Sequence, residues 1–258
     1  MILMQQNLIN EMDEVSRKIE YLVGSATTIN EMRELAAKTP FDNEIIDFLN
    51  TLSKMLMKLP EAKMYPDVIT LAFWMRKSSV MELRKRFMKQ TKDIVLGRGI
   101  AFHIAPSNVP VNYAYSLVTG LLTGNANIVR IPSKEFPQVS IINKAIKSIL
   151  EEYPNVARYI CLVRYERDPN INDLISGIAD IRIIWGGDNT IKEIRKSPLG
   201  ARANDVTFAD RYSLAVIDSE QYLAVDDKER LAEEFYNDTY LSDQNACTSP
   251  RMVVWLGN

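Results

Sequence analysis

Apolar and polar positions in the middle of the chain follow the pattern of a strand, a helix and a second strand. Residues 100–105 form a short apolar run that ends at a proline, which is typical of a buried strand. Residues 111–122 carry apolar side chains at helical spacing, and Gly124 follows as a C-terminal stop. Residues 127–131 are a second apolar run, which Pro132 ends. This strand–helix–strand unit is the building block of a parallel sheet.

The alternation of strands and helices continues toward the C-terminus. The pattern predicts helices over residues 137–153, 172–179, 190–196 and 226–240 and strands over residues 160–163, 181–185, 206–208, 214–217 and 252–256. This order predicts an open α/β sheet with helices on both faces. Because ligands of such sheets bind at the carboxyl ends of the strands, we expect Asn108, Arg130 and Gly186 to lie at that edge.

Residues 1–95 are predicted to form a helical region. One apolar stripe runs through residues 8–23, a second runs through residues 45–56, and a third begins after Pro66. The basic tract at residues 83–87, Leu-Arg-Lys-Arg-Phe, is either an anion-binding patch or a solvated helix face. The solvated face is favoured, because most charge runs are of that kind.

Composition narrows the class of protein. With 258 residues and a formal net charge of -2, the chain is one large domain or two small ones and has no basic field for nucleic acid. No apolar run reaches the length of about 18 residues that a transmembrane helix needs, and the N-terminus lacks a signal-peptide pattern. Two cysteines argue against a disulfide framework and favour a cytoplasmic location.

Two turns of the first strand–helix–strand unit resemble sequences of the aldehyde dehydrogenase superfamily. Residues 106–110 read Pro-Ser-Asn-Val-Pro, and residues 123–125 read Thr-Gly-Asn. In that superfamily a Pro-x-Asn-x-Pro turn carries an oxyanion-binding asparagine, and a Thr-Gly-Asn turn leads into a cofactor-binding strand. Both turns match without a gap.

A closer resemblance is to the long-chain acyl-CoA reductase (LuxC) family of that superfamily, and it covers roughly residues 60–258. The matching stretches are Tyr-Pro-Asp-Val at 65–68 with Phe73-Trp74, Ile-Trp-Gly-Gly-Asp at 184–188, and Asp-Gln-Asn-Ala-Cys at 243–247 with Ser249-Pro250.

The resemblance implies an α/β fold of the aldehyde dehydrogenase type, with a Rossmann-like parallel sheet. Residues 1–95 would be an N-terminal helical region, residues 96–217 a dinucleotide-binding domain, and residues 218–258 the start of an incomplete catalytic domain. Family members continue well past position 258. We therefore expect this sequence to be a piece of a longer chain, a truncated product or one half of a split protein.

Cys247 is the first candidate for chemistry. A lone cysteine is usually a small buried apolar residue, and this interpretation is favoured for Cys161 in its apolar strand. Cys247 lies instead in a short polar loop between a helix and a strand. The resemblance of residues 244–247 to the superfamily's nucleophile loop implies a thiolate that attacks an acyl carbon and holds the acyl group as a thioester.

Asn108 is the second candidate. An asparagine in a turn after a strand is often only a turn former, because its side chain bonds nearby backbone. The Pro-x-Asn-x-Pro resemblance implies a further role, in which the Asn108 amide and the Cys247 backbone N–H both donate to a developing oxyanion. Spacing alone does not establish this pair.

The resemblance also implies cofactor contacts, which would come from Ala105, Pro106, Ser107, Arg130, Ser133, Lys134, Trp185, Gly186 and Gly187. In NAD-using relatives the position matching Ser133 often holds a glutamate that would repel a 2′-phosphate. Here Ser133 stands between the cations Arg130 and Lys134, which favours NADPH over NADH. Taken without the resemblance, these residues would be a solvated strand end, and the glycine pair is a weak signal.

One departure from the superfamily separates reduction from hydrolysis. Hydrolytic aldehyde dehydrogenases carry a water-activating glutamate in a segment aligned with residues 206–212, and the matching position here is Ala209, beside Asp210. Without that base, attack of water on a thioester is slow. His103, the only histidine, lies inside an apolar strand, so a structural role is favoured over a Cys–His pair.

These observations predict an NADPH-dependent acyl-CoA reductase that converts a long-chain acyl thioester, from acyl-CoA or an acyl-protein, into a fatty aldehyde. The resemblance further implies a homo-oligomer and an acyl-activating synthetase as partner. No metal site is predicted. The alternative from another class is a non-catalytic nucleotide-binding fragment or the regulatory half of a split reductase.

Overall fold

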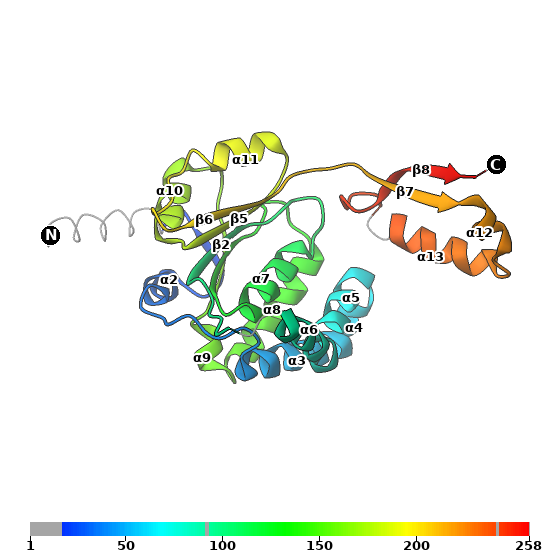
Figure 1. The fold of residues 1–258 in the computed structure, drawn as a ribbon. Coiled ribbons are helices and arrows are strands. Elements are labelled where there is room, and N and C mark those ends of the chain that lie inside the picture. Colours follow the sequence, from blue (N-terminus) through cyan, green and yellow to red (C-terminus); the bar gives the residue numbers. More distant parts are fainter. Residues whose placement is uncertain (1–16, 91–92, 241–242, 258) are drawn as a thin grey trace, which may run out of the picture. The chain divides into compact units, whose positions relative to one another are not determined.

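The computed structural model of the protein describes residues 17–90, 93–240 and 243–257 (Figure 1). The chain forms two compact units: unit 1 is Met1–Phe208 and unit 2 is Ala209–Asn258. Within the described ranges, no helix is both long enough and apolar enough to cross a membrane.

Unit 1 is built on a six-stranded sheet in the order β1-β4-β3-β2-β5-β6. Its strands are β1 Glu20–Val23, β2 Ile100–Ile104, β3 Ala126–Arg130, β4 Ile160–Arg164, β5 Ile181–Trp185 and β6 Asn204–Phe208. Strands β2 to β6 run parallel, and β1 is antiparallel to β4 at one edge. The carboxyl ends of β4, β3, β2 and β5 therefore lie next to one another.

Helices cover both faces of this sheet, which confirms the predicted α/β architecture. The connections are α7 Asn112–Leu122, α8 Pro137–Leu150 with α9 Pro154–Ala157, α10 Pro169–Ile178, and α11 Asp188–Ile194. Figure 1 shows α10 and α11 on one side of the strands and α7 and α8 on the other. Strands β2 and β3 are almost fully buried between these layers, as is typical of central strands of a parallel sheet.

The N-terminal region of unit 1 contains the helices α2 Ala26–Met32, α3 Asn43–Lys58, α4 Pro60–Lys63, α5 Pro66–Trp74 and α6 Lys77–Gln90. Helix α3 packs against α7 and α8, and α4 packs against α8. Helix α3 contains the second predicted stripe, and Ile45, Leu49 and Leu52 are buried there. Helix α5 begins at Pro66, where the third stripe was expected to begin.

The first predicted stripe, through residues 8–23, is wrong as a helix where it can be compared with the structure. Residues 1–16 lie outside the described residues. Glu20–Val23 is the edge strand β1, and Tyr21 pairs with Val163 of β4. Helical spacing of the apolar residues is outweighed here by pairing to the open edge of β4, a non-local contact that periodicity does not register.

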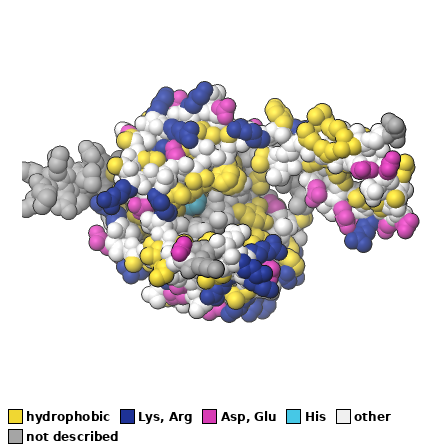
Figure 2. Space-filling view, viewed as in Figure 1, with side chains coloured by type: hydrophobic (Ala, Val, Ile, Leu, Met, Phe, Trp, Pro, Cys, Tyr) yellow, Lys and Arg dark blue, Asp and Glu magenta, His cyan; other side chains and the backbone are white. Residues whose placement is uncertain are grey.

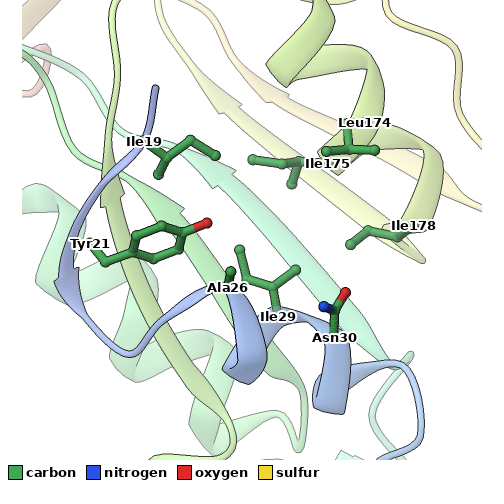
Figure 3. Close-up of a pocket in the computed structure, with 8 residues that line it drawn as sticks. All are labelled: Ile19, Tyr21, Ala26, Ile29, Asn30, Leu174, Ile175 and Ile178. Atoms are coloured by element: carbon green, nitrogen blue, oxygen red, sulfur yellow. The ribbon is translucent and has the colours of Figure 1, made fainter. Parts of the chain in front are cut away.

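Helix α2 packs its apolar side toward α10. Figure 3 shows Ala26 and Ile29 of α2 facing Leu174, Ile175 and Ile178 of α10 across a small pocket. The cavity there is about 20 Å³, room for about one water molecule and too small for an organic ligand.

The Thr-Gly-Asn turn lies at the amino end of β3 and braces the sheet there. Gly124 has φ +84, and an added Cβ would collide with the backbone carbonyl of Lys38. The Asn125 side chain accepts from the backbone N–H of Arg98 at 2.6 Å, just before β2. The turn therefore fixes the register of β2 and β3 from the end opposite to the expected ligand edge.

Unit 2 contains a two-stranded parallel sheet, β7 Ser213–Asp218 and β8 Pro250–Leu256, with helices α12 Ser219–Ala224 and α13 Lys228–Tyr240. The domain predicted over residues 96–217 includes the predicted strand at 214–217. In the structure this strand, β7, pairs with β8 and not with the six-stranded sheet. Its Leu214 and Val216 are more than half exposed. Parallel strands are usually covered on both faces, so this pair is unusually open.

A buried arginine joins the elements on one side of unit 1. Arg182 of β5 is 2% exposed, and its Nε and Nη2 donate to the two carboxylate oxygens of Asp205 in β6 at 2.9 and 3.0 Å. Its Nη1 donates to Ser176 of α10 and to the carbonyls of Ile194 and Ser197. Burial raises the pKa of Asp205, but hydrogen bonds from Arg182 and Arg195 outweigh it and hold this pKa below its usual range.

Removing the charge of Asp205 should leave the Arg182 guanidinium buried without a counter-ion. We expect Asp205→Asn to lower the free energy of unfolding by about 3–5 kcal/mol, measured by urea unfolding. Arg195→Gln is the matched control, because Arg195 also bonds Asp205 but is 52% exposed, and its loss should cost under about 1 kcal/mol. Equal losses in the two variants would contradict the role of Arg182.

His103 is a buried structural histidine, as its apolar strand predicts. Its Nε2 lies 3.0 Å from Oδ1 of Asn127, whose amide nitrogen donates to the Asn125 carbonyl, so Nε2 donates. Burial lowers the pKa of His103 to about 4, although the Asn127 contact opposes the shift. An added Cβ at Gly120 would collide with Asn127, so α7 needs glycine where it crosses this pair.

Stability should therefore fall in mild acid. Because unfolding restores an ordinary histidine pKa of about 6.5, the unfolded chain binds the extra proton and stability is lost as pH drops from that value toward 4. We expect about 2–3 kcal/mol of the loss between about pH 7.5 and about pH 4.5 to come from His103. Urea unfolding of His103→Gln at both pH values should show this part missing; an unchanged loss would contradict it.

Candidate functional site

Three segments of the predicted cofactor site meet at the carboxyl edge of the sheet. Strand β2 ends before the turn at residues 105–110, β3 ends at Arg130, and β5 ends before Gly186 and Gly187. Because β2 pairs with both β3 and β5, these three ends are neighbours, as the sequence predicts. The Ala105 N–H donates to the Arg130 carbonyl at 3.1 Å and extends the pairing by one residue.

Asn108 lies in the turn that leads from β2 into α7. The turn is exposed at Ser107 and Asn108, while Ala105 is buried and Pro106 is half-buried. Pro110 comes just before the helix, where its fixed φ favours the start of a helix. An exposed amide at a strand end can donate to a ligand there, and the oxyanion role itself stays a prediction.

Arg130 is held mainly by Tyr165. Its Nη2 donates to the Tyr165 carbonyl at 3.3 Å, and its guanidinium lies 4.6 Å from the centre of the Tyr165 ring. Its Nε is buried and makes no hydrogen bond. Tyr165 therefore fixes the direction of this cation, and part of its donor capacity is still unused.

Ser133 and Lys134 are exposed in the loop between β3 and α8, and the Lys134 ammonium lies 4.8 Å from the centre of the Phe136 ring. Sequence reasoning missed Arg164, which ends the neighbouring strand β4 and pairs with Glu20 at 3.2 Å and Glu135 at 3.8 Å. An arginine at the last position of an apolar strand was the available signal. This edge thus carries a third cation, already paired.

Trp185 is fixed by its neighbours. Its Nε1 donates to the Ser116 hydroxyl at 2.8 Å, and its ring stacks on Phe208 at 4.0 Å between centroids. At Gly187, which has a negative φ, an added Cβ would meet no atom within 4 Å. Neither conformation nor packing requires glycine there, and the open space would admit a ligand close to the backbone. The residues at this edge thus fit a dinucleotide.

Cys247 lies in unit 2, in the loop between α13 and β8, and it is exposed. The Ser213 hydroxyl donates to the Cys247 carbonyl at 2.7 Å and ties the loop to β7. Asp243 and Gln244, at the start of the loop, have φ values of 50° and 58°, a conformation that is costly for residues other than glycine. Such strain often marks functional loops.

The second cysteine, Cys161, differs from Cys247 in its burial and in its reactivity. Cys161 is fully buried in β4, and burial raises the pKa of its thiol to about 12. Because the thiolate is the nucleophilic form, Cys161 is inert at neutral pH. Of the two thiols, only Cys247 is available to a reagent.

Asn108 belongs to unit 1 and Cys247 to unit 2, so the oxyanion pair stays a prediction. No group of side chains among the described residues could hold a metal ion. A wider groove of about 580 Å³ lies between α3, α4 and α8, lined among others by Met55, Leu59, Met64 and Ile141. It contains none of the predicted site residues.

Comparisons with known proteins show the family and the fold. The model of the acyl-CoA reductase (LuxC) family matches residues 7–257. A long-chain acyl-protein thioester reductase from Aliivibrio fischeri is 25% identical over 163 residues, which are 62% of this chain and 33% of the relative. The matched stretch thus spans about a third of that relative's length.

Solved structures show the fold. An aldehyde dehydrogenase from Bartonella henselae superposes with a TM-score of 0.61 at 13% identity, over 92% of this chain and 57% of that one. Betaine aldehyde dehydrogenase from Staphylococcus aureus, solved with NAD+, superposes with a TM-score of 0.55 at 14% identity, over 83% and 45% of the two chains. At these identities the likeness establishes the aldehyde dehydrogenase fold.

Proposed function

Because this chain belongs to the acyl-CoA reductase (LuxC) family, we propose that it serves the NADPH-dependent reduction of a long-chain acyl thioester to a fatty aldehyde. The observation that carries the proposal is the contrast between the two thiols. Cys247 is exposed in a strained loop, and Cys161 is buried and inert. The name of the Aliivibrio fischeri relative, a long-chain acyl-protein thioester reductase, supports the substrate class.

Cys247 acts as the nucleophile in this proposal. Its thiolate attacks the acyl carbon, a new carbon–sulfur bond forms, and the thiol of the donor leaves, so the acyl group is held as a thioester on the chain. The Asn108 amide and the Cys247 backbone N–H donate to the oxygen that gains negative charge during the attack. Ala209 stands where hydrolytic relatives carry a glutamate, so water hydrolyses the thioester to a carboxylic acid only slowly.

The carboxyl edge of unit 1 binds the cofactor. Ala105, Pro106, Ser107, Trp185, Gly186 and Gly187 would line its nicotinamide and pyrophosphate parts. Arg130, Ser133 and Lys134 would hold the 2′-phosphate, with Tyr165 orienting Arg130. When bound, NADPH would supply the hydride that reduces the thioester to an aldehyde, and the Cys247 thiol would be released.

The wider setting also belongs to the proposal. The donor would be acyl-CoA or an acyl-protein, a synthetase would supply the acyl group, and copies of the enzyme would assemble in the cytoplasm. Residues 218–258 would belong to a catalytic domain.

A binding-only function is the alternative. The edge formed by β2, β3 and β5 would then hold a nucleotide without turnover, and unit 2 would be regulatory. This alternative predicts NADPH binding together with an unmodified Cys247.

Acylation separates the two. After incubation with a long-chain acyl-CoA, intact-mass spectrometry should find one thioester adduct on wild type and on Cys161→Ala, and none on Cys247→Ala. The adduct should persist without cofactor, because no aligned glutamate activates water. An adduct that survives Cys247→Ala, or none on wild type or on a longer version of the chain, would favour binding without catalysis.

Cofactor preference tests the 2′-phosphate site. Charge-assisted contacts to a phosphate are worth ~1.5–3 kcal/mol each, so NADPH should bind roughly tenfold or more tightly than NADH in calorimetry. Ser133→Glu should erase or reverse that preference by placing a carboxylate beside the phosphate. Ser140→Glu, an exposed serine on α8, is the control for added charge. Equal affinities for both cofactors, unchanged by Ser133→Glu, would rule the site out.

A further inference from the structure

The helices from the end of α3 to α6 carry a concentration of positive charge. Residues 54–89 contain nine Lys or Arg residues against three Asp or Glu residues, although the whole chain has a net charge of -2. Figure 2 shows Lys and Arg side chains crowded at the lower right of unit 1, where Figure 1 draws α4 to α6. This part of the surface is therefore locally basic.

Exposed hydrophobic side chains gather in the same stretch. Unit 1 exposes nine large hydrophobic residues among its described positions, and seven of them lie between residues 57 and 96. The seven are Met57, Met64, Phe73, Met81, Met88, Ile94 and Leu96. A contiguous apolar patch marks an interaction surface, whereas single exposed residues are common on any protein. Of the seven, Met81 and Met88 both belong to α6.

Helix α6 combines both properties on one face. Only Val80 of this helix is buried, and Lys77, Met81, Lys85 and Lys89 follow one another at intervals of four residues along its exposed side. Met88 and Arg84 lie beside this row at helical spacing. We name these six residues the α6 face.

Most cations of the α6 face form no ion pair with a carboxylate of the described residues. Lys77 pairs with Asp47 at 2.8 Å. Arg84, Lys85 and Lys89 have no carboxylate partner in the described parts of the chain. Three cations without a carboxylate partner beside two exposed methionines fit a partner that offers negative charge and apolar groups close to each other.

We infer that the α6 face binds an anionic lipid surface. Lysine and arginine reach the phosphates with their charged ends while their stems lie over the acyl boundary, and methionine fits the irregular apolar region beneath. A nucleic acid would contact the cations and leave Met81 and Met88 in water, whereas a lipid surface contacts both kinds of side chain. The inference does not depend on Cys247 or on the cofactor edge.

Vesicle sedimentation tests the inference with the chain as it is. The protein should pellet with vesicles of equal parts phosphatidylcholine and phosphatidylglycerol but not with phosphatidylcholine alone, and added salt should weaken binding. The triple variant Arg84→Glu, Lys85→Glu, Lys89→Glu should lower the partition coefficient tenfold or more. Each cation near an anionic membrane surface raises partitioning by roughly fivefold. Met81→Ser with Met88→Ser should lower it severalfold without changing the charge.

The matched control reverses three cations outside this face, Lys192→Glu, Lys196→Glu and Arg202→Glu, and should bind like wild type. Circular dichroism confirms that each variant is folded. No binding to anionic vesicles at low salt, or equal loss in the control, would overturn the inference. Binding to heparin or DNA that matches the vesicle affinity and ignores the methionine variant would assign the face to another polyanion and overturn it as well.

Discussion

The bidentate pair between Arg182 and Asp205 is the constraint on which the proposed cofactor edge depends. Each nitrogen of the buried Arg182 guanidinium donates a hydrogen bond, and together these bonds reach β6, α10 and the end of α11. Those bonds hold α11 against β5, and so hold Gly186 and Gly187 where β5 ends. Loss of either member of the ion pair would lower the free energy of unfolding. The elements that Arg182 joins should therefore unfold together.

Strand order then decides which side chains meet. Since β2 stands between β3 and β5, the turn at Asn108, the cation Arg130 and the glycine pair reach one edge from positions far apart in the sequence. The opposite edge is occupied by the Thr-Gly-Asn turn and is structural. The proposed thiol, Cys247, comes from unit 2, so the proposed binding and the proposed covalent chemistry come from different compact units of the chain.

Local signals in the sequence were sufficient for much of the fold. The stretch from β2 to β3 could be predicted because its proline and glycine stops coincide with changes of apolar period. Burial of Cys161 and His103 followed from the apolar strands around them. Strand β1 could not be found in this way, because Glu20–Val23 becomes a strand only by pairing with β4, more than a hundred residues away. The Arg182 network is non-local for the same reason.

A motif can nominate a residue for the candidate site, but the partners of that residue appear only in the structure. Asn108 and Cys247 were proposed from their motifs, whereas the bond between Arg130 and Tyr165 needed the structure.

Hydrogen–deuterium exchange with and without NADPH tests the central claim most directly. Protection by the cofactor should concentrate at residues 105–108, 130–134 and 185–188. Protection confined to other segments, or none at saturating NADPH, would contradict the assignment of this edge.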